Sequence, residues 1–211
     1  MDLDLAEPPE DPAALRRFPT RILRRSTSIH RIHHDELGPF WFGSAEPVAE
    51  GGGRFDLATP GGSSYWALQP EAAFLERLAR RPVTVLPLEL LDRFHLSTVD
   101  LPDDLIVANS PVKRARAFGL SAEFHTTSHY PITRRWANAL ASAGHAGLLA
   151  IPRHDVTAKL RSLTIFGRGG EHRPRRWNAS TGPLPTSLLD AMSRWGIRSL
   201  PVPFDVETIR P

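Results

Sequence analysis

Residues 52–76 constrain the fold more than any other part of this 211-residue chain. They read GGRFDLATPGGSSYWALQPEAAFLE, in which a glycine-rich turn leads to a polar loop and then to a short apolar run, SSYWAL. Glycine supplies turn conformations that other residues avoid, and the aromatic run has the composition of a strand. This block therefore predicts a turn, a strand and a helix in close succession.

The helix of this block is the clearest element of the sequence, and we expect it over residues 70–80. Pro70 suits the first helical turn, and Glu71 complements the positive N-terminal end of the helix dipole. At 100° per residue, one apolar arc forms, with Glu76 at its edge. The members of that arc are Ala72, Phe74, Leu75, Leu78 and Ala79.

The remaining elements mix strands and helices irregularly. The patterns predict strands within 22–34, 83–90, 95–101, 104–109, 144–151, 162–166 and 197–202, and helices at 112–118, 133–143 and from 186, where Thr186 would cap the helix, to just before Gly196. A doubly wound sheet would show regular β-α-β-α alternation, which is absent. We therefore expect an α+β fold with a mostly antiparallel sheet and flanking helices.

The composition bounds the organisation of the chain. Residues 1–18 are acidic and rich in proline, which predicts a disordered tail before a single domain over 19–211. The N-terminus lacks the basic start and apolar stretch of a secretory signal, and no apolar run approaches the roughly 18 residues of a membrane span. There are no cysteines. These features predict a cytoplasmic protein without disulfides or thiolate metal sites.

The charge distribution and the absence of common motifs argue against most other functions. The net charge of +3 is small, and the arginine clusters are typical of a solvated surface or of a site for an anion such as phosphate. Direct nucleic-acid binding is a weaker interpretation, because no helix-turn-helix or zinc-finger spacing appears. The segment GGGRF lacks the pattern of a phosphate loop or of a dinucleotide fingerprint. The segment HRIHHD (30–35) is not expected to bind metal, because His33 and His34 point to opposite faces of a strand.

Four side chains in order along the chain carry a family resemblance. They are found in His30-Arg31, Gly53-Arg54-Phe55-Asp56, Tyr65-Trp66-Ala67 and Ala73-Phe74-Leu75-Glu76. Over residues 28–166 this order resembles the RES domain family. The resemblance implies a fold related to the ADP-ribosyltransferase toxins. It also implies NAD as substrate, with cleavage of the nicotinamide–ribose bond by water (glycohydrolase) or inorganic phosphate (phosphorylase).

The resemblance further implies a growth-inhibiting toxin paired with an antitoxin protein, so that nucleic acid would be reached only through the antitoxin. It assigns catalysis to Glu76 and Tyr65 and NAD binding to Arg31, Arg54 and Gly53, with no cofactor beyond NAD as substrate. These residue types suit that chemistry. Arginine binds pyrophosphate, a tyrosine face can stack on the cationic nicotinamide ring, and a carboxylate stabilises an oxocarbenium-like state. Each residue by itself has an ordinary structural explanation, for example a Glu76 pair with Arg80 one turn later.

One position departs from the family pattern. RES proteins carry a serine in a later segment, and the matching stretch here, LAIPRHD (149–155), has Pro152 in its place. Either the register differs, or His154 or Arg153 replaces the serine, or the protein binds its ligand and turns it over poorly. His154 is therefore included among the NAD-binding candidates. A catalytically weak module that binds a nucleotide or a partner remains the alternative function.

Overall fold

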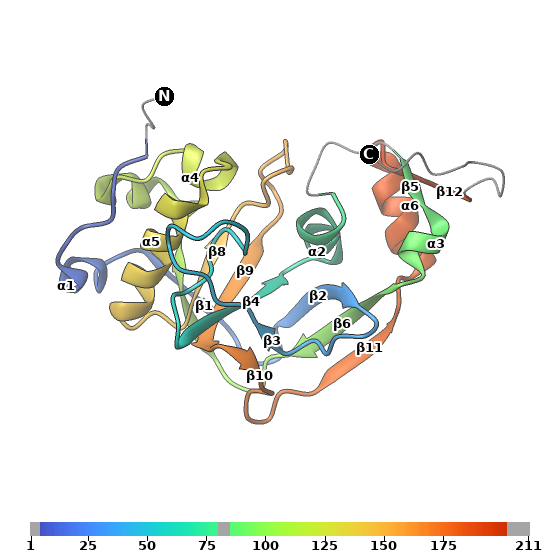
Figure 1. Cartoon of the computed structure of the whole chain (residues 1–211), viewed down its shortest axis with the longest axis horizontal. Helices are drawn as coiled ribbons and strands as arrows, with labels where there is room; N and C mark the ends of the chain where they lie inside the picture. The colour runs from blue at the N-terminus through green and yellow to red at the C-terminus, as the bar shows by residue number, and fades with distance from the viewer. Residues whose placement is uncertain (1–4, 80–84, 202–211) are drawn as a thin grey trace.

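The computed structural model describes residues 5–79 and 85–201. Its centre is an eight-stranded sheet (Figure 1). In sheet order the strands are β1 (Thr20–Leu23), β7 (Leu105–Asn109), β8 (Gly147–Ala150), β9 (Ser162–Arg168), β4 (Gly61–Ala67), β2 (Ser28–His34), β6 (Phe94–Asp100) and β11 (Ala179–Pro183). All neighbours pair antiparallel except β7 and β8. The predicted α+β class with a mostly antiparallel sheet is confirmed.

Two small sheets and short helices complete the chain. Strand β3 (Trp41–Phe42) pairs antiparallel with β10 (Gly170–Glu171), and β5 (Val85–Pro87) pairs parallel with β12 (Arg198–Leu200). The short helices are α1 (Pro12–Leu15), α3 (Leu88–Leu91), α4 (Glu123–Thr126) and the 3-10 helix η1 (Lys113–Phe118). Within the described residues, no helix has the length and apolar character that a membrane crossing requires.

The longer helices lie in two places and cover different parts of the sheet (Figure 1). Helix α5 (Tyr130–Ser142) lies with α1 beside β8, and buries Trp136 and Leu140 in one core cluster. Helix α2 (Pro70–Arg77) lies over β2 and β4 and packs with α6 (Thr186–Arg194) around Phe74 and Met192. The two cores flank the middle of the sheet, where β4 and β2 meet.

Strands β4 and β2 are joined at one register pair, His30 with Ala67. On its other side each strand pairs over its whole length, β4 with β9 and β2 with β6. The two neighbouring strands therefore diverge from a single junction, under helix α2. Arg31 and Tyr65, one on each strand, lie beside this junction.

The N-terminal segment departs from the prediction of a disordered tail over 1–18. In the part that the structure describes, Leu5, Leu15 and Phe18 are buried in the core around α5. Glu7 pairs with Arg135, and the Trp136 indole donates to the Ala6 carbonyl at 2.8 Å. The acidic, proline-rich composition concealed three apolar anchors, whose burial offsets the entropy of ordering the segment.

Four element predictions also need correction. Residues 22–34 form two strands, because a turn with Ser26 at φ 66° separates β1 from β2. Residues 113–118 form a 3-10 helix, and Thr186 is the first residue of α6, whose N-cap is Pro185. Helix α2 ends at Arg77 rather than at residue 80, which lies outside the described residues together with 81–84 and 202.

Candidate active site

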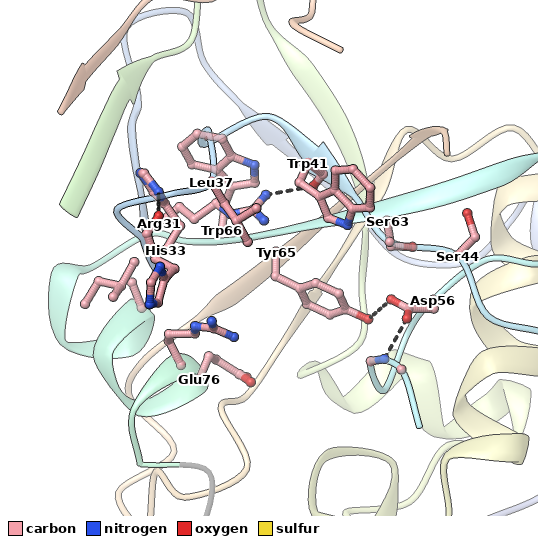
Figure 2. Close-up of a pocket in the computed structure, with 17 residues that line it drawn as sticks. Arg31, His33, Leu37, Trp41, Ser44, Asp56, Ser63, Tyr65, Trp66 and Glu76 are labelled. Atoms are coloured by element: carbon pink, nitrogen blue, oxygen red, sulfur yellow. Dashed lines mark hydrogen bonds between the residues drawn. The ribbon is translucent and has the colours of Figure 1, made fainter. Parts of the chain in front are cut away.

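Two adjoining hollows lie beneath helix α2, at the divergence of β2 and β4. The larger has a volume of about 480 Å³, and its wall includes Arg31, Trp41, Asp56, Tyr65, Glu76 and Arg77 (Figure 2). The smaller, of about 60 Å³, is lined by Arg54, Tyr130, Arg153 and His154 among others. Both hollows share Gly52, Gly53, Tyr65 and Glu76. Each of the six residues that the sequence proposes for the site therefore lines one or both of these adjoining hollows.

Tyr65 projects from β4 toward the glycine-rich turn. Its hydroxyl donates to Asp56 Oδ1 at 2.7 Å and accepts from the Phe55 amide at 2.9 Å, and Asp56 Oδ2 accepts from the Gly53 amide at 2.6 Å (Figure 2). Burial, followed by the Asp56 charge, raises the pKa of Tyr65 well above its ordinary value. The phenol therefore stays protonated at neutral pH.

Gly53 is required by this close approach. A Cβ atom at position 53 would lie 2.2 Å from the Tyr65 hydroxyl oxygen and 2.7 Å from Asp56 Oδ1. Both distances are far below van der Waals contact, so any side chain here would displace the ring. The role of this glycine in the structure is to let the turn close against the tyrosine.

Arg54 is buried between protein acceptors, with 7% of its side chain exposed. It lies 3.2 Å from the Glu76 carboxylate, donates to the Ile151 carbonyl at 3.4 Å, and also donates to the His125 carbonyl. Its own backbone carbonyl accepts from the Thr133 hydroxyl at 2.6 Å. Arg54 thus links the glycine-rich turn to the segments that flank the smaller hollow, and its guanidinium orients Glu76.

Glu76 lies on α2 with 25% of its side chain exposed, at the place shared by both hollows. Its predicted position at the edge of the apolar arc explains this placement. Ala72, Ala73, Phe74 and Leu75 are buried, so the next side chain along the helix emerges at the rim of the packed face. A carboxylate is therefore held in a partly desolvated position where its field is stronger than in water.

Arg31 is a cation in the wall of the larger hollow. It donates to the Trp41 carbonyl at 2.9 Å and to the Ser64 hydroxyl. Within residues 5–79 and 85–201, none of the ion pairs involves Arg31. Burial, followed by the charge of Arg77, lowers the pKa of Arg31 to about 10, so it stays charged at neutral pH.

His154, Arg153 and Pro152 belong to the loop after β8. His154 and Arg153 line the smaller hollow, while Pro152 is buried and its carbonyl accepts from the Asp155 amide. Asp155 shapes this loop, because its carboxylate accepts from the Thr157 and Leu160 amides at 2.9 and 2.7 Å. The two side chains that could replace the family's serine are therefore positioned at the site.

The histidine cluster of β2 does not converge on one point. His33 is buried, with its ring bonded to the Ser97 hydroxyl and to the His34 carbonyl. His34 lies instead beside the carboxylates of Asp35 and Glu36, and these three could together hold a metal ion. Asp35 and Glu36 are exposed, and the group is local to one turn. We assign it no role.

Arg134 is a structural residue that the sequence did not distinguish from the surface arginines. Its place in the Arg134–Arg135 pair suggested a surface or an anion site, but only 1% of it is exposed. It donates to the carbonyls of Glu46, Ala49, Gly51 and Gly53, and so fixes the glycine-rich turn on α5. Arg135, in contrast, is bonded to Glu7 near the surface. Helical periodicity was the one signal available, because it places Arg134 near the apolar face of α5.

Comparison with known proteins agrees with this architecture. A family model described as the RES domain matches residues 28–156, a range that contains all six site residues. A chain in the crystal structure of the M. tuberculosis MbcT–MbcA toxin–antitoxin complex superposes with a TM-score of 0.62. The two chains are 18% identical, and the match covers 88% of this chain and 98% of the other, so the likeness concerns the fold. No curated protein matches the sequence significantly.

Proposed function

Because this chain belongs to the RES domain family, we propose that it is an enzyme that cleaves the nicotinamide–ribose bond of NAD. The observation that carries this proposal is the combination, in one cavity, of the Glu76 carboxylate and the Arg31 cation. In NAD, the nicotinamide ring at the glycosidic bond carries a positive charge, and the pyrophosphate carries negative charge. A carboxylate and a cation in the same hollow complement these two groups.

Glu76 serves the reacting ribose in this proposal. Breaking an N-glycosidic bond produces positive charge on the anomeric carbon, and a nearby carboxylate stabilises that charge. Arg54 holds the carboxylate in place at 3.2 Å. Tyr65 lines both hollows, and its ring can stack there on the nicotinamide while Asp56 fixes its hydroxyl.

The acceptor is water or inorganic phosphate. Arg153 and His154 line the smaller hollow, next to Glu76, and would receive it there. Pro152 cannot supply the hydroxyl of the family's serine, and this difference supports a second candidate function, a RES-fold module that binds nucleotide without turnover. The structural neighbour's title names a toxin and an antitoxin. By that likeness we propose that this chain acts as a growth-inhibiting toxin with an antitoxin protein as its partner.

The test is incubation of the purified full chain with NAD, with and without phosphate. We expect free nicotinamide to accumulate, with ADP-ribose as the second product if water is the acceptor and its 1″-phosphate if phosphate is. Chromatography with mass spectrometry separates these products. NAD binding without nicotinamide release would reject the enzyme and support the binding module.

Arg31→Met is expected to weaken NAD binding about 10- to 100-fold and to destabilise the protein less than Arg54→Met. The loss follows from removal of a charge-assisted contact to the pyrophosphate, worth about 1.5–3 kcal/mol. The loss of stability should be modest, about 1–2 kcal/mol, because the change removes the donors of the Trp41 carbonyl and the Ser64 hydroxyl but breaks none of the ion pairs within the described residues. Calorimetric titration with NAD and thermal unfolding measure the two effects. Unchanged affinity would remove Arg31 from the binding site.

A further inference from the structure

Trp41 is an indole on the wall of the larger hollow with 47% of its surface exposed. It lies on β3, and the other residue of this strand, Phe42, is buried and stacks on His172. The backbone of Trp41 pairs with Glu171 of β10, which fixes the residue on a strand rather than on a loose loop. A large apolar side chain at such a position remains in water although the adjacent Phe42 is fully packed.

The position of Trp41 relative to the Arg31 cation is defined by a hydrogen bond. Its backbone carbonyl accepts from Arg31 Nη1 at 2.9 Å, and Figure 2 shows the indole extending from this contact along the upper side of the cavity. An anion bound at Arg31 would therefore lie next to the residue that carries the indole. Because the contact uses the backbone carbonyl, it does not depend on which side chain occupies position 41.

The tyrosine and the second tryptophan of this cavity have other contacts or another proposed role, since the Tyr65 ring is assigned to the nicotinamide. The Tyr65 hydroxyl is held by Asp56 and the Phe55 amide. Trp66 is 3% exposed, its Nε1 donates to the Ser64 hydroxyl at 3.0 Å, and its ring packs edge-on against Trp177. Of the aromatic residues that line the larger hollow, Trp41 has the greatest exposed surface for a flat ligand.

We infer that Trp41 is the stacking platform for the adenine ring of the dinucleotide. This inference rests on the proposed function, which places the reacting ribose at Glu76 and the pyrophosphate at Arg31. In NAD, the adenosine is attached to the pyrophosphate on the side away from the reacting ribose. In the cavity, the exposed ring next to Arg31 is that of Trp41. Stacking on an aromatic ring is worth about 1–3 kcal/mol per base, or roughly 5- to 150-fold in affinity.

The experiment compares ligands that do and do not contain adenine. Calorimetric titration of the full chain with ADP-ribose and with nicotinamide mononucleotide would be performed for the wild type, Trp41→Ala and Trp41→Phe. For Trp41→Ala we expect about a tenfold weaker affinity for ADP-ribose and an unchanged affinity for nicotinamide mononucleotide. Trp41→Phe should retain most of the ADP-ribose affinity, because phenylalanine can still stack.

Ile106→Ala provides a matched control, since Ile106 is also an exposed apolar side chain of a strand but does not line the cavity. Its ligand affinities should equal those of the wild type. Equal weakening of both ligands by Trp41→Ala would overturn the inference, because the ring would then serve the reactive end. Unchanged ADP-ribose affinity in Trp41→Ala, or no ADP-ribose binding by the wild type, would overturn it as well.

These outcomes are separate from a failure of the proposed reaction. Nicotinamide release from NAD by the wild type tests turnover and makes no use of Trp41 variants. ADP-ribose binding requires no turnover. A protein that binds ADP-ribose through Trp41 but releases no nicotinamide would support the adenine platform and reject the enzyme. In a protein that does release nicotinamide, Trp41→Ala should also raise the KM for NAD about tenfold with little change in kcat.

Discussion

Replacing Glu76 by glutamine is expected to lower the kcat of nicotinamide release about 10²- to 10⁴-fold. The substitution keeps the size of the side chain and an oxygen that can still accept from Arg54, which lies 3.2 Å from the carboxylate. It removes only the negative charge that would stabilise the oxocarbenium-like state. The affinity for NAD should change little, because that charge acts mainly on the transition state. Initial-rate assays of nicotinamide release with calorimetric binding of NAD measure both quantities.

Glu71→Gln is the matched control for this prediction. Glu71 lies on the same helix, in its first turn, and does not line either hollow. Its substitution should leave kcat within about twofold and cost at most a few tenths of a kcal/mol through the helix dipole. Undiminished nicotinamide release by Glu76→Gln would exclude Glu76 as the catalytic carboxylate.

Replacing Arg54 by methionine is expected to lower the free energy of unfolding by about 3 kcal/mol. The change removes the donors of the His125 and Ile151 carbonyls and leaves the partly buried Glu76 carboxylate without this cation. For a chain of this length, such a loss lowers Tm by about 6–12 °C. Nicotinamide release should also fall, because Glu76 loses the contact that orients it. Denaturant unfolding and the release assay check these two effects.

The Arg54–Glu76 pair can be isolated with a double-mutant cycle. If the two side chains interact as the structure shows, Arg54→Met combined with Glu76→Gln should be less destabilised than the sum of the single variants, by about 1–2 kcal/mol. Arg135→Met serves as the comparison, because its pair with Glu7 is largely exposed and should contribute at most about 1 kcal/mol. Additive single effects would show that Arg54 stabilises the fold without acting on Glu76.

Local sequence pattern was informative wherever one element determines its own geometry. The glycine-rich turn, the strand with Tyr65 and the helix with Glu76 were all predictable, because turn chemistry and the helical period are local properties. The same period placed Glu76 at the rim of the apolar face, which is where the structure has it. The irregular order of strands and helices also indicated the α+β class correctly.

Local pattern failed where a residue's role depends on distant contacts. The acidic N-terminal segment is held through Glu7 and the Ala6 carbonyl by partners on α5, more than a hundred positions along the chain. Arg134 had the composition of a surface cluster, yet it fixes a turn that precedes it by more than eighty residues. Composition reports average preferences, and these contacts form only once the strands have brought the segments together.

The sequence by itself therefore determined the identity and order of the candidate groups: a cation on the first site strand, a Gly-Arg turn, a tyrosine and a helical carboxylate. Only the tertiary structure decided how they divide their roles. Arg31 and Arg54 are the same residue type, but Arg54 contacts the Glu76 carboxylate and donates to two backbone carbonyls. Arg31 lines the cavity, and none of the ion pairs within the described residues involves it. The physical reason is the divergence of β2 and β4 from a single register pair, a long-range feature that no local pattern encodes.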